Sequence, residues 1–338
     1  MEHNNTSVDK IAIIGLGLIG GSIGLALKTL RKPKVEIVGF DLRPSQAKRA
    51  SKMGAIDRAA KDLRSAVENA GLVILAVPIL AIRDNLEAIG PLLIPGSVVT
   101  DTGSTKEAVL HWAEQYLPDG ISFVGGHPMA GKEESGIQAA VPNLFVDRRY
   151  CVIPGKNADQ DAVKAVTDLV LALKAKPYFL DAVEHDSYVA AVSHLPIVLS
   201  AALVSSTQRS PSWREMSKLA ATGYRDVSRL ASGDPIMNLD ICLSNQESLT
   251  RWIDYMITEL SRYRTMIANG EPELAKELEN VHQARNIWLH HFTTGIEEDK
   301  KPRVEPPSVT DILLGEFTRR YTKLFDFWEK KQQKGPRK

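Results

Sequence analysis

A glycine-rich turn between an apolar run and a helix-like segment is the feature that most constrains this fold. Gly15, Gly17 and Gly20 form a GxGxxG pattern that follows the apolar run 10–15 and opens the segment 20–30. Gly15 allows a tight turn, Gly17 lets the backbone approach a pyrophosphate, and Gly20 lets helix and strand pack closely. The N-terminus of the helix offers free N–H groups to the anion. The pattern predicts a dinucleotide site; the alternative is a turn needed only for packing.

An acidic residue ends the next apolar run, 35–41. Asp41 lies about 20 residues after Gly20, where a carboxylate can accept hydrogen bonds from the ribose hydroxyls. A carboxylate there repels a 2′-phosphate and favours NAD, although Arg43 could pair with that phosphate, so NADP stays possible. The alternative role of Asp41 is a helix cap ahead of Pro44. The residues expected at the cofactor are Gly15, Gly17, Leu18, Ile19, Gly20, Asp41, Arg43, Val77, Pro78 and Thr102.

Short β-branched runs alternate with helix-like segments over the first half of the chain. Several runs are apolar throughout, as strands covered on both faces must be. This alternation predicts an α/β domain with a doubly wound, Rossmann-type parallel sheet, over residues 8–181. The expected strands are 10–15, 35–41, 72–78, 97–101, 122–126, 150–154 and 177–181.

The strand signal stops after Asp181, and two long segments with helical spacing follow, 184–208 and 247–267. We expect an all-α substrate and dimerisation domain over 182–295, and a homodimer formed through it. One apolar stripe of the second segment is expected to be core. Its members are Leu249, Trp252, Met256, Leu260, Tyr263 and Ile267.

Residues 296–338 are expected to form a linker and a C-terminal helical tail. The segment 300–307 is rich in proline and charge, as linkers are. An apolar seam follows it and is expected to dock on the dimer. The seam consists of Leu314, Phe317, Tyr321, Leu324 and Trp328.

Composition excludes several classes of function. Lys plus Arg number 42 and Asp plus Glu number 41, so the net charge of +1 gives no attraction to nucleic acid or anionic membranes. No uninterrupted apolar run reaches the 18 or so residues that a membrane span needs. The two cysteines, Cys151 and Cys242, are far apart, which fits a reducing compartment and offers no thiolate metal site. A cytoplasmic protein without a bound metal is expected.

Two candidate catalytic residues follow predicted strands, where ligands bind in doubly wound sheets. His127 lies in GGHPMAGKEESG (125–136), and its imidazole could take a proton from a substrate hydroxyl while hydride leaves the adjoining carbon. Ser104 lies in DTGSTK (101–106), and its hydroxyl can donate and accept a hydrogen bond. The alternatives are a structural histidine and the N-cap of the helix that follows Ser104.

Charged and histidine side chains in the helical half allow two interpretations. Arg225 and Arg229 lie four positions apart, with Asp226 between them, and an arginine fork recognises a carboxylate. The alternative is a set of surface charges worth tenths of a kcal/mol. His194 could be a core histidine on an apolar helix, and His185 a capping or exposed one.

Five motifs in order resemble the prephenate/arogenate dehydrogenases of tyrosine biosynthesis, from Lys10 to about Ile267. They are GLGLIGGS (15–22), DTGSTK (101–106), GGHPMAGKEESG (125–136), VSHLP (192–196) and TGYRDVSRLASGDP (222–235). The resemblance implies a dinucleotide-binding domain followed by a helical dimerisation domain. It also implies NAD(P)-dependent oxidative decarboxylation of a cyclohexadienol that bears a ring carboxylate. Prephenate would give 4-hydroxyphenylpyruvate, and arogenate would give tyrosine.

The resemblance also implies roles for single residues. His127 matches the histidine that bonds the ring hydroxyl, and Ser104 matches the serine that supports it. Arg229 matches the arginine that holds the ring carboxylate, and Asp226 orients the neighbouring arginines. The remaining matches are Glu133 in the network around the site, Gly223 beside the substrate side chain, and His194 as structural support.

One departure from the family pattern bears on the substrate. Prephenate-using members often carry a second histidine after SHLP, and this chain has Ile197 there. Losing that imidazole weakens recognition of a pyruvyl group, so we expect arogenate to be the better substrate. Prephenate alone, or both substrates, stays possible.

Two other classes of protein are less favoured by the sequence. A β-hydroxyacid dehydrogenase would carry a lysine in 184–208, which contains none. A cofactor-sensing regulator would need neither His127 nor Arg229. The segment after residue 270 lacks the βαββαβ alternation of an appended regulatory domain.

Overall fold

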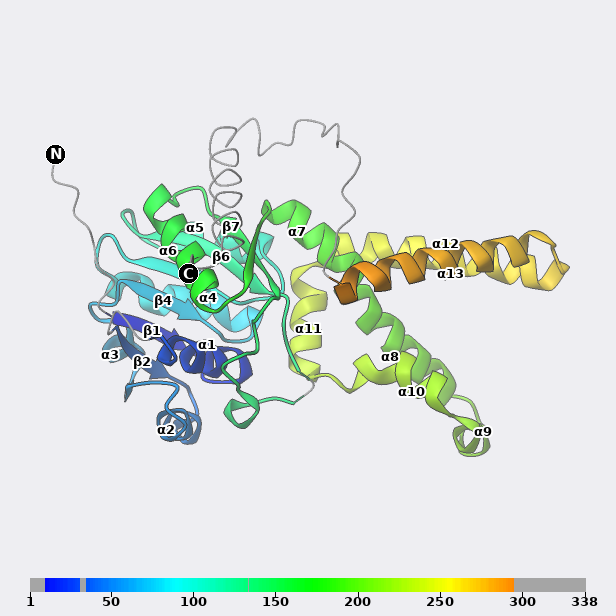
Figure 1. Cartoon of the computed structure of the whole chain (residues 1–338), viewed down its shortest axis with the longest axis horizontal. Coiled ribbons are helices and arrows are strands. Elements are labelled where there is room, and N and C mark those ends of the chain that lie inside the picture. Colours follow the sequence, from blue (N-terminus) through cyan, green and yellow to red (C-terminus); the bar gives the residue numbers. More distant parts are fainter. Residues whose placement is uncertain (1–9, 31–34, 133, 295–338) are drawn as a thin grey trace, which may run out of the picture. The chain divides into compact units, whose positions relative to one another are not determined.

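The computed structural model describes residues 10–30, 35–132 and 134–294 (Figure 1). The chain forms two compact units, residues 1–252 and 253–338. The first unit contains the sheet and most of the helices. The predicted tail 296–338, its apolar seam and Glu133 lie outside the described residues.

Eight strands form one sheet in the order β3-β2-β1-β4-β5-β6-β7-β8. All seven predicted strands are confirmed; the eighth, β3, has only two exposed residues and no apolar signal. The strands are β1 (Lys10–Ile14), β2 (Glu36–Phe40), β3 (Arg58–Ala59), β4 (Leu72–Leu75), β5 (Val98–Asp101), β6 (Ser122–Pro128), β7 (Arg149–Pro154) and β8 (Lys176–Phe179).

The sheet is a doubly wound α/β sheet, as predicted, but it is not parallel throughout. β6 and β7 pair antiparallel, with Val124 opposite Pro154 and Pro128 opposite Tyr150. Among the described residues of the connection 129–148 the structure shows a 3₁₀ turn, η2 (Ile137–Ala139), and no α-helix of the kind that usually forms a parallel crossover. β7 and β8 pair parallel, so both run opposite to the other six strands.

Helices connect the strands and build the second half of the chain. The N-terminal helices are α1 (Leu18–Lys28), α2 (Pro44–Lys52), α3 (Leu63–Val67), α4 (Ile79–Ile89), η1 (Gly90–Leu92), α5 (Glu107–Tyr116) and α6 (Gln160–Ala172). The others are α7 (Ala182–Val189), η3 (Ala190–His194), α8 (Leu195–Gln208), α9 (Trp213–Leu219), α10 (Thr222–Ser228), η4 (Arg229–Ser232), α11 (Pro235–Ser244), α12 (Gln246–Asn269) and α13 (Glu273–Thr294).

One buried apolar cluster joins β1, β4, β5 and β6 to α3, α4 and α5. Ile82, Leu86 and Ile89 of α4 are fully buried in it, and Ile241 of α11 packs against the same cluster. Right-handed crossovers place α1 and α2 on the opposite face of the sheet. Both faces are therefore covered, which explains why the central strand β4 is apolar at every position.

The long apolar segment 184–208 is helical, as predicted, and runs from Ala182 to Gln208 through the π-helical turn η3. By length and composition it could span a membrane, although only 28% of its most apolar window is buried. The segment contains serines and a histidine, so it is not an uninterrupted apolar run, although its mean hydropathy reaches the level of a membrane span.

The predicted helix 247–267 is confirmed as α12, but the interpretation of its whole stripe as core is wrong. Leu249 is buried, whereas Leu260 is 58% exposed and Ile267 is 65% exposed. Met266, outside the stripe, is buried instead. Spacing alone identifies an apolar face, and it does not say whether the same chain covers that face.

A carboxylate of the helical half caps a helix of the sheet domain. The Leu80 N–H at the start of α4 donates to Asp240 Oδ2 of α11 at 3.1 Å, and Asp240 is buried. The cap residue of α4 is Pro78, whose side chain has no acceptor. Asp240 thus satisfies a helix N–H group that local sequence leaves without a partner.

We expect Asp240→Ala to lower the free energy of unfolding by about 1–2 kcal/mol, as the loss of other helix caps does. Chemical denaturation with two spectroscopic probes measures this. Asp84→Ala, an exposed aspartate on the same helix, is the matched control. Equal stabilities of the two variants would contradict a capping role.

Candidate active site

The carboxyl ends of β1, β4, β5 and β6 lie at one edge of the sheet, because these four strands are mutually parallel. The glycine loop follows β1, Val77 and Pro78 follow β4, and Thr102 follows β5. The Thr102 N–H donates to Leu75 O at 3.1 Å, which ties the two connections together. The predicted cofactor residues therefore gather along this edge.

The glycine loop has the geometry that a dinucleotide requires. Gly15 has φ +91°, and a Cβ atom there would lie 2.3 Å from Ala76 O. A Cβ on Gly20 would lie 2.0 Å from Gly15 O, whereas a Cβ on Gly17 would meet nothing within 4 Å. Two glycines are thus required by packing. The third leaves open space at the N-terminus of α1, where Leu18 and Ile19 begin the helix.

Asp41 holds the glycine loop from the end of β2. Its Oδ2 accepts a hydrogen bond from Leu16 N and its Oδ1 accepts one from Arg43 N, each at 2.9 Å. The cap position of α2 is Arg43, so the alternative assignment of Asp41 as that cap is wrong. The Arg43 side chain is largely exposed, with Nε 3.7 Å from Asp41 Oδ1.

His127 is the sixth residue of β6 and only 8% exposed. Its Nδ1 lies 2.9 Å from Nε2 of His185 on α7, and the two rings meet edge to face. Nδ1 of His185 in turn lies 2.7 Å from Oδ1 of Asp186. Three side chains therefore form one buried hydrogen-bonded chain that ends on a carboxylate.

The carboxylate of Asp186 determines which nitrogen donates in each of these two hydrogen bonds. Asp186 accepts the proton of His185 Nδ1, which leaves His185 Nε2 to accept the proton of His127 Nδ1. His127 Nε2 is then the unprotonated nitrogen. Burial, then the charges of His185, Lys106 and His194, hold the pKa of His127 well below its ordinary value. The geometry defines a neutral imidazole able to accept a proton.

The sequence interpretation of His185 as a capping or exposed residue is wrong. His185 is fully buried, and the cap of α7 is Asp181, which accepts a hydrogen bond from Glu184 N at 2.8 Å. Neither His185 nor Asp186 has a local pattern that marks it. The only sequence signal is a pair of titratable residues at the start of an apolar helix.

Asp186 also caps α5, which follows the Ser104 loop. Its Oδ1 accepts a hydrogen bond from Lys106 N at 2.7 Å, and its Oδ2 accepts one from Glu107 N at 2.9 Å. The alternative role of Ser104 as the N-cap of this helix is therefore wrong, because Asp186 caps it from another part of the chain. Ser104 is half-buried at the carboxyl end of β5.

His194 is buried behind this network, in the π-helical turn η3. Its Nδ1 lies 3.2 Å from Asn245 Nδ2, which also donates to Asp186 O at 2.8 Å. Its Nε2 finds no hydrogen-bond partner among the described residues. Burial lowers the pKa of His194 to about 4, so the ring is neutral.

The predicted substrate residues of the 222–235 segment lie elsewhere in the same unit. Gly223, Asp226 and Arg229 are all exposed, and Asp226 pairs with Arg225 at 3.1 Å. η4, which begins at Arg229, packs against α8. The structure thus places these residues around α8, separate from the contacts of His127.

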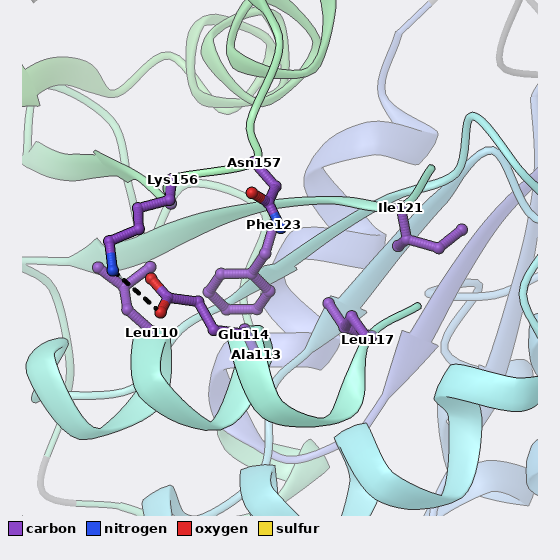
Figure 2. A pocket seen from close by; sticks show the side chains of 9 residues that line it. Leu110, Ala113, Glu114, Leu117, Ile121, Phe123, Lys156 and Asn157 are labelled. Atoms are coloured by element: carbon purple, nitrogen blue, oxygen red, sulfur yellow. Dashed lines mark hydrogen bonds and ion pairs between the residues drawn. The ribbon is translucent and has the colours of Figure 1, made fainter. Parts of the chain in front are cut away.

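A small pocket between α5 and β6 is not part of this site. Figure 2 shows Leu117, Ile121 and Phe123 lining it, with an ion pair between Lys156 and Glu114. Leu117 follows α5 and Ile121 precedes β6, so the pocket lies at the opposite end of β6 from His127.

The fold and the glycine loop define a nucleotide-binding α/β protein with a buried histidine on β6. Residues 23–179 match the family described as prephenate dehydrogenase, nucleotide-binding domain, and residues 181–281 match its dimerization domain. The chain therefore belongs to the prephenate dehydrogenase family of oxidoreductases. The glycine loop itself precedes the matched range.

The similar proteins include prephenate dehydrogenases and an arogenate dehydrogenase. Prephenate dehydrogenase of Bacillus subtilis is 38% identical over 80% of this chain and 73% of its own. The structure of Synechocystis arogenate dehydrogenase is 31% identical, with a TM-score of 0.71 over 82% of this chain and 99% of that one. Prephenate dehydrogenase of Aquifex aeolicus, in complex with hydroxyphenyl propionate and NAD⁺, is 28% identical, with a TM-score of 0.77 over 83% and 99%.

We expect His194 to make stability depend on pH. Because its pKa is about 4 in the folded chain, only the unfolded chain takes up this proton as pH falls below about 6.5. Folding stability should therefore decrease by up to about 3 kcal/mol between pH 6.5 and 4. His194→Gln should flatten this dependence in urea titrations, whereas His290→Gln, at an exposed position, should not. Parallel curves for the two variants would contradict the assignment.

Proposed function

We propose that the chain catalyses the NAD-dependent oxidative decarboxylation of arogenate to tyrosine. The observation that carries the proposal is the buried chain from His127 through His185 to Asp186. It supplies a neutral base at the edge of the sheet where a bound dinucleotide would present its nicotinamide. Bound NAD would accept the hydride from the ring carbon that carries the hydroxyl.

The proposed role of His127 is to receive the hydroxyl proton on Nε2. The ring carbon loses hydride, the hydroxyl loses its proton to His127, and the carboxylate leaves as carbon dioxide while the ring becomes aromatic. The hydroxyl oxygen is retained as the phenol oxygen. Ser104 would support the hydroxyl from the loop after β5. Aromatisation supplies the driving force, so the protein mainly positions groups and stabilises charge.

The role of His185 and Asp186 follows from the charge that His127 gains. A protonated His127 in a buried site is costly unless an anion compensates it. Its Nδ1–H donates to His185, and His185 donates to the Asp186 carboxylate, so the anion is two hydrogen bonds away. His185 and Asp186 therefore hold His127 in one tautomer and offset its positive charge, as the aspartate of a catalytic triad does.

The cofactor would be held by the residues of the glycine loop. The backbone of Gly17, Leu18 and Ile19 would bind the pyrophosphate, and Asp41 would bind the ribose. Asp41 uses one lone pair of each oxygen within the protein, so it keeps acceptor capacity for hydroxyls. Val77, Pro78 and Thr102 would line the nicotinamide side, and Arg43 is the residue through which NADP could be accepted.

The substrate carboxylate is assigned to Arg229, with Asp226, Gly223 and Glu133 around it and His194 as support. These assignments rest on the family motifs. α10 and η4, which carry Gly223, Asp226 and Arg229, have no buried side chains. We propose that a second copy of the chain, bound through the dimerisation domain, covers these elements. The enzyme is assigned to the cytoplasm, where its pathway would operate.

The preference for arogenate rests on Ile197. Its side chain is partly buried and packs against the apolar cluster that contains Ile82, Leu86 and Ile89 of α4. An aliphatic side chain offers no hydrogen bond to a keto acid. The alternative functions are prephenate dehydrogenase or a cyclohexadienyl dehydrogenase that uses both substrates.

His127→Ala is expected to lower kcat about 10²- to 10⁴-fold, because the proton acceptor is lost. NADH formation followed by absorbance at saturating substrate measures this. His111→Ala, a histidine on α5, is the control. A His127 variant within threefold of the wild-type kcat would remove this residue from the mechanism.

The substrate preference predicts a kcat/KM for arogenate at least about tenfold above that for prephenate, because unmatched polar groups discriminate strongly. Ile197→His should move the ratio towards prephenate, with Ile197→Val as the matched control. A wild-type enzyme that favours prephenate would refute the preference and leave the family assignment intact.

A further inference from the structure

A fully buried ion pair lies under the candidate site, at the end of β5. Lys106 Nζ donates to Asp101 Oδ2, and both side chains have no exposed surface. The same oxygen accepts a hydrogen bond from Gly103 N at 2.7 Å, and Oδ1 accepts one from Gly126 N at 3.1 Å. The cofactor and substrate assignments above do not use either residue.

The carboxylate of Asp101 joins the two loops that carry the candidate catalytic side chains. Gly103 immediately precedes Ser104, and Gly126 immediately precedes His127. A Cβ on Gly126 would lie 2.5 Å from Asp101 O, so the backbone there is in close contact with the end of β5. Loss of this carboxylate would release both loops at once.

Lys106 is connected to His127 through two separate sets of hydrogen bonds. Its side chain reaches His127 through Asp101 and Gly126. Its main-chain N–H donates to Asp186 Oδ1, the oxygen that also accepts the proton of His185. One residue is therefore linked to the base on both sides, through its side chain and through its backbone.

A buried ion pair such as Asp101–Lys106 contributes little to folding stability. Taking two charges out of water costs more than their attraction usually returns, and apolar residues of similar volume serve a core as well or better. A buried pair beside a catalytic base is better explained by what it does to that base.

We propose that Asp101 and Lys106 are positioning residues that hold Ser104 and His127 together and fix the charge environment of the proton acceptor. The roles of Ser104 and His127 rest on the function proposed above. The geometry of the pair stands independently of that function.

The charged and titratable groups near His127 come from five parts of the fold. Asp101 ends β5, Lys106 is the cap residue of α5, His185 and Asp186 lie on α7, His194 in η3, and Tyr150 and Cys151 on β7. After burial and the charge of His185, the Lys106 cation is the next cause that lowers the pKa of His127. A cation here keeps the base unprotonated to lower pH.

The test removes each charge separately while keeping side-chain size. Lys106→Met should raise the pKa of His127 and move the acid limb of kcat/KM to higher pH by about one pH unit. Asp101→Asn removes the anion and should lower that pKa or leave it unchanged. The double variant, which has neither charge, should lie between the two single variants. Lys156→Met, at a largely exposed lysine, is the control.

Proton NMR titration of the His127 ring, assigned with His127→Asn, gives the same pKa without any turnover. A wild-type chain inactive on both substrates would refute the proposed function, and the NMR titration would still test the ion pair. An unchanged His127 pKa in folded Lys106→Met would overturn the proposal. A rise of the His127 pKa in both single variants would also overturn it, because loosened packing alone would shift that pKa in the same direction in both. If Lys106→Met does not fold, the double variant compared with Asp101→Asn supplies the same test.

Discussion

One carboxylate, that of Asp186, links the helical half of the chain to the reactive edge of the sheet. It accepts three hydrogen bonds, two from the first N–H groups of α5 and one from His185. The positive end of a helix dipole stabilises an anion at this position. The same charge then serves His127 through one intervening imidazole. Asp186 therefore caps α5 and orients the His127 ring at the same time, so a change that moves α7 moves that ring and the start of α5 together.

Asp240 repeats this arrangement at α4. In both cases an acidic side chain from the helical half satisfies the N-terminus of a helix that follows a central strand. These bonds hold α11 and α7 against the helices that begin after β4 and β5, beside the Val77–Pro78 turn and the Ser104 loop. Directional bonds between charged and backbone groups set a relative position that apolar packing alone, which tolerates sliding, would leave less defined.

The sequence predicts what depends on neighbours along the chain. Apolar runs predict seven strands correctly, and the glycine spacing predicts a turn whose Gly15 and Gly20 leave no room for a Cβ atom. What it misses depends on residues far apart. His127 and His185 are 58 positions apart, so neither spacing nor periodicity relates them. The sequence pattern also does not predict that β7 pairs antiparallel with β6, because the direction of a strand depends on the connection that precedes it. Spacing also predicts that exposed residues of α12 belong to the core, because an apolar face has the same spacing whichever surface covers it.

In the role proposed for His127, the charges near this residue meet two opposite requirements of a proton acceptor. Before reaction the ring must be neutral, and burial together with the Lys106 cation favours the neutral form. After reaction the ring carries a proton, and a nearby anion must compensate it. Asp186 supplies that anion at a distance of two hydrogen bonds, and Asp101 keeps the Lys106 charge balanced beneath the backbone of Gly126. A cation placed without Asp101 would oppose protonation of the ring throughout. An anion in direct contact would raise the pKa of the ring, so that it would already carry a proton before the reaction. Because the Lys106 cation and the Asp186 anion lie at different positions, the same imidazole can be neutral before the reaction and protonated during it.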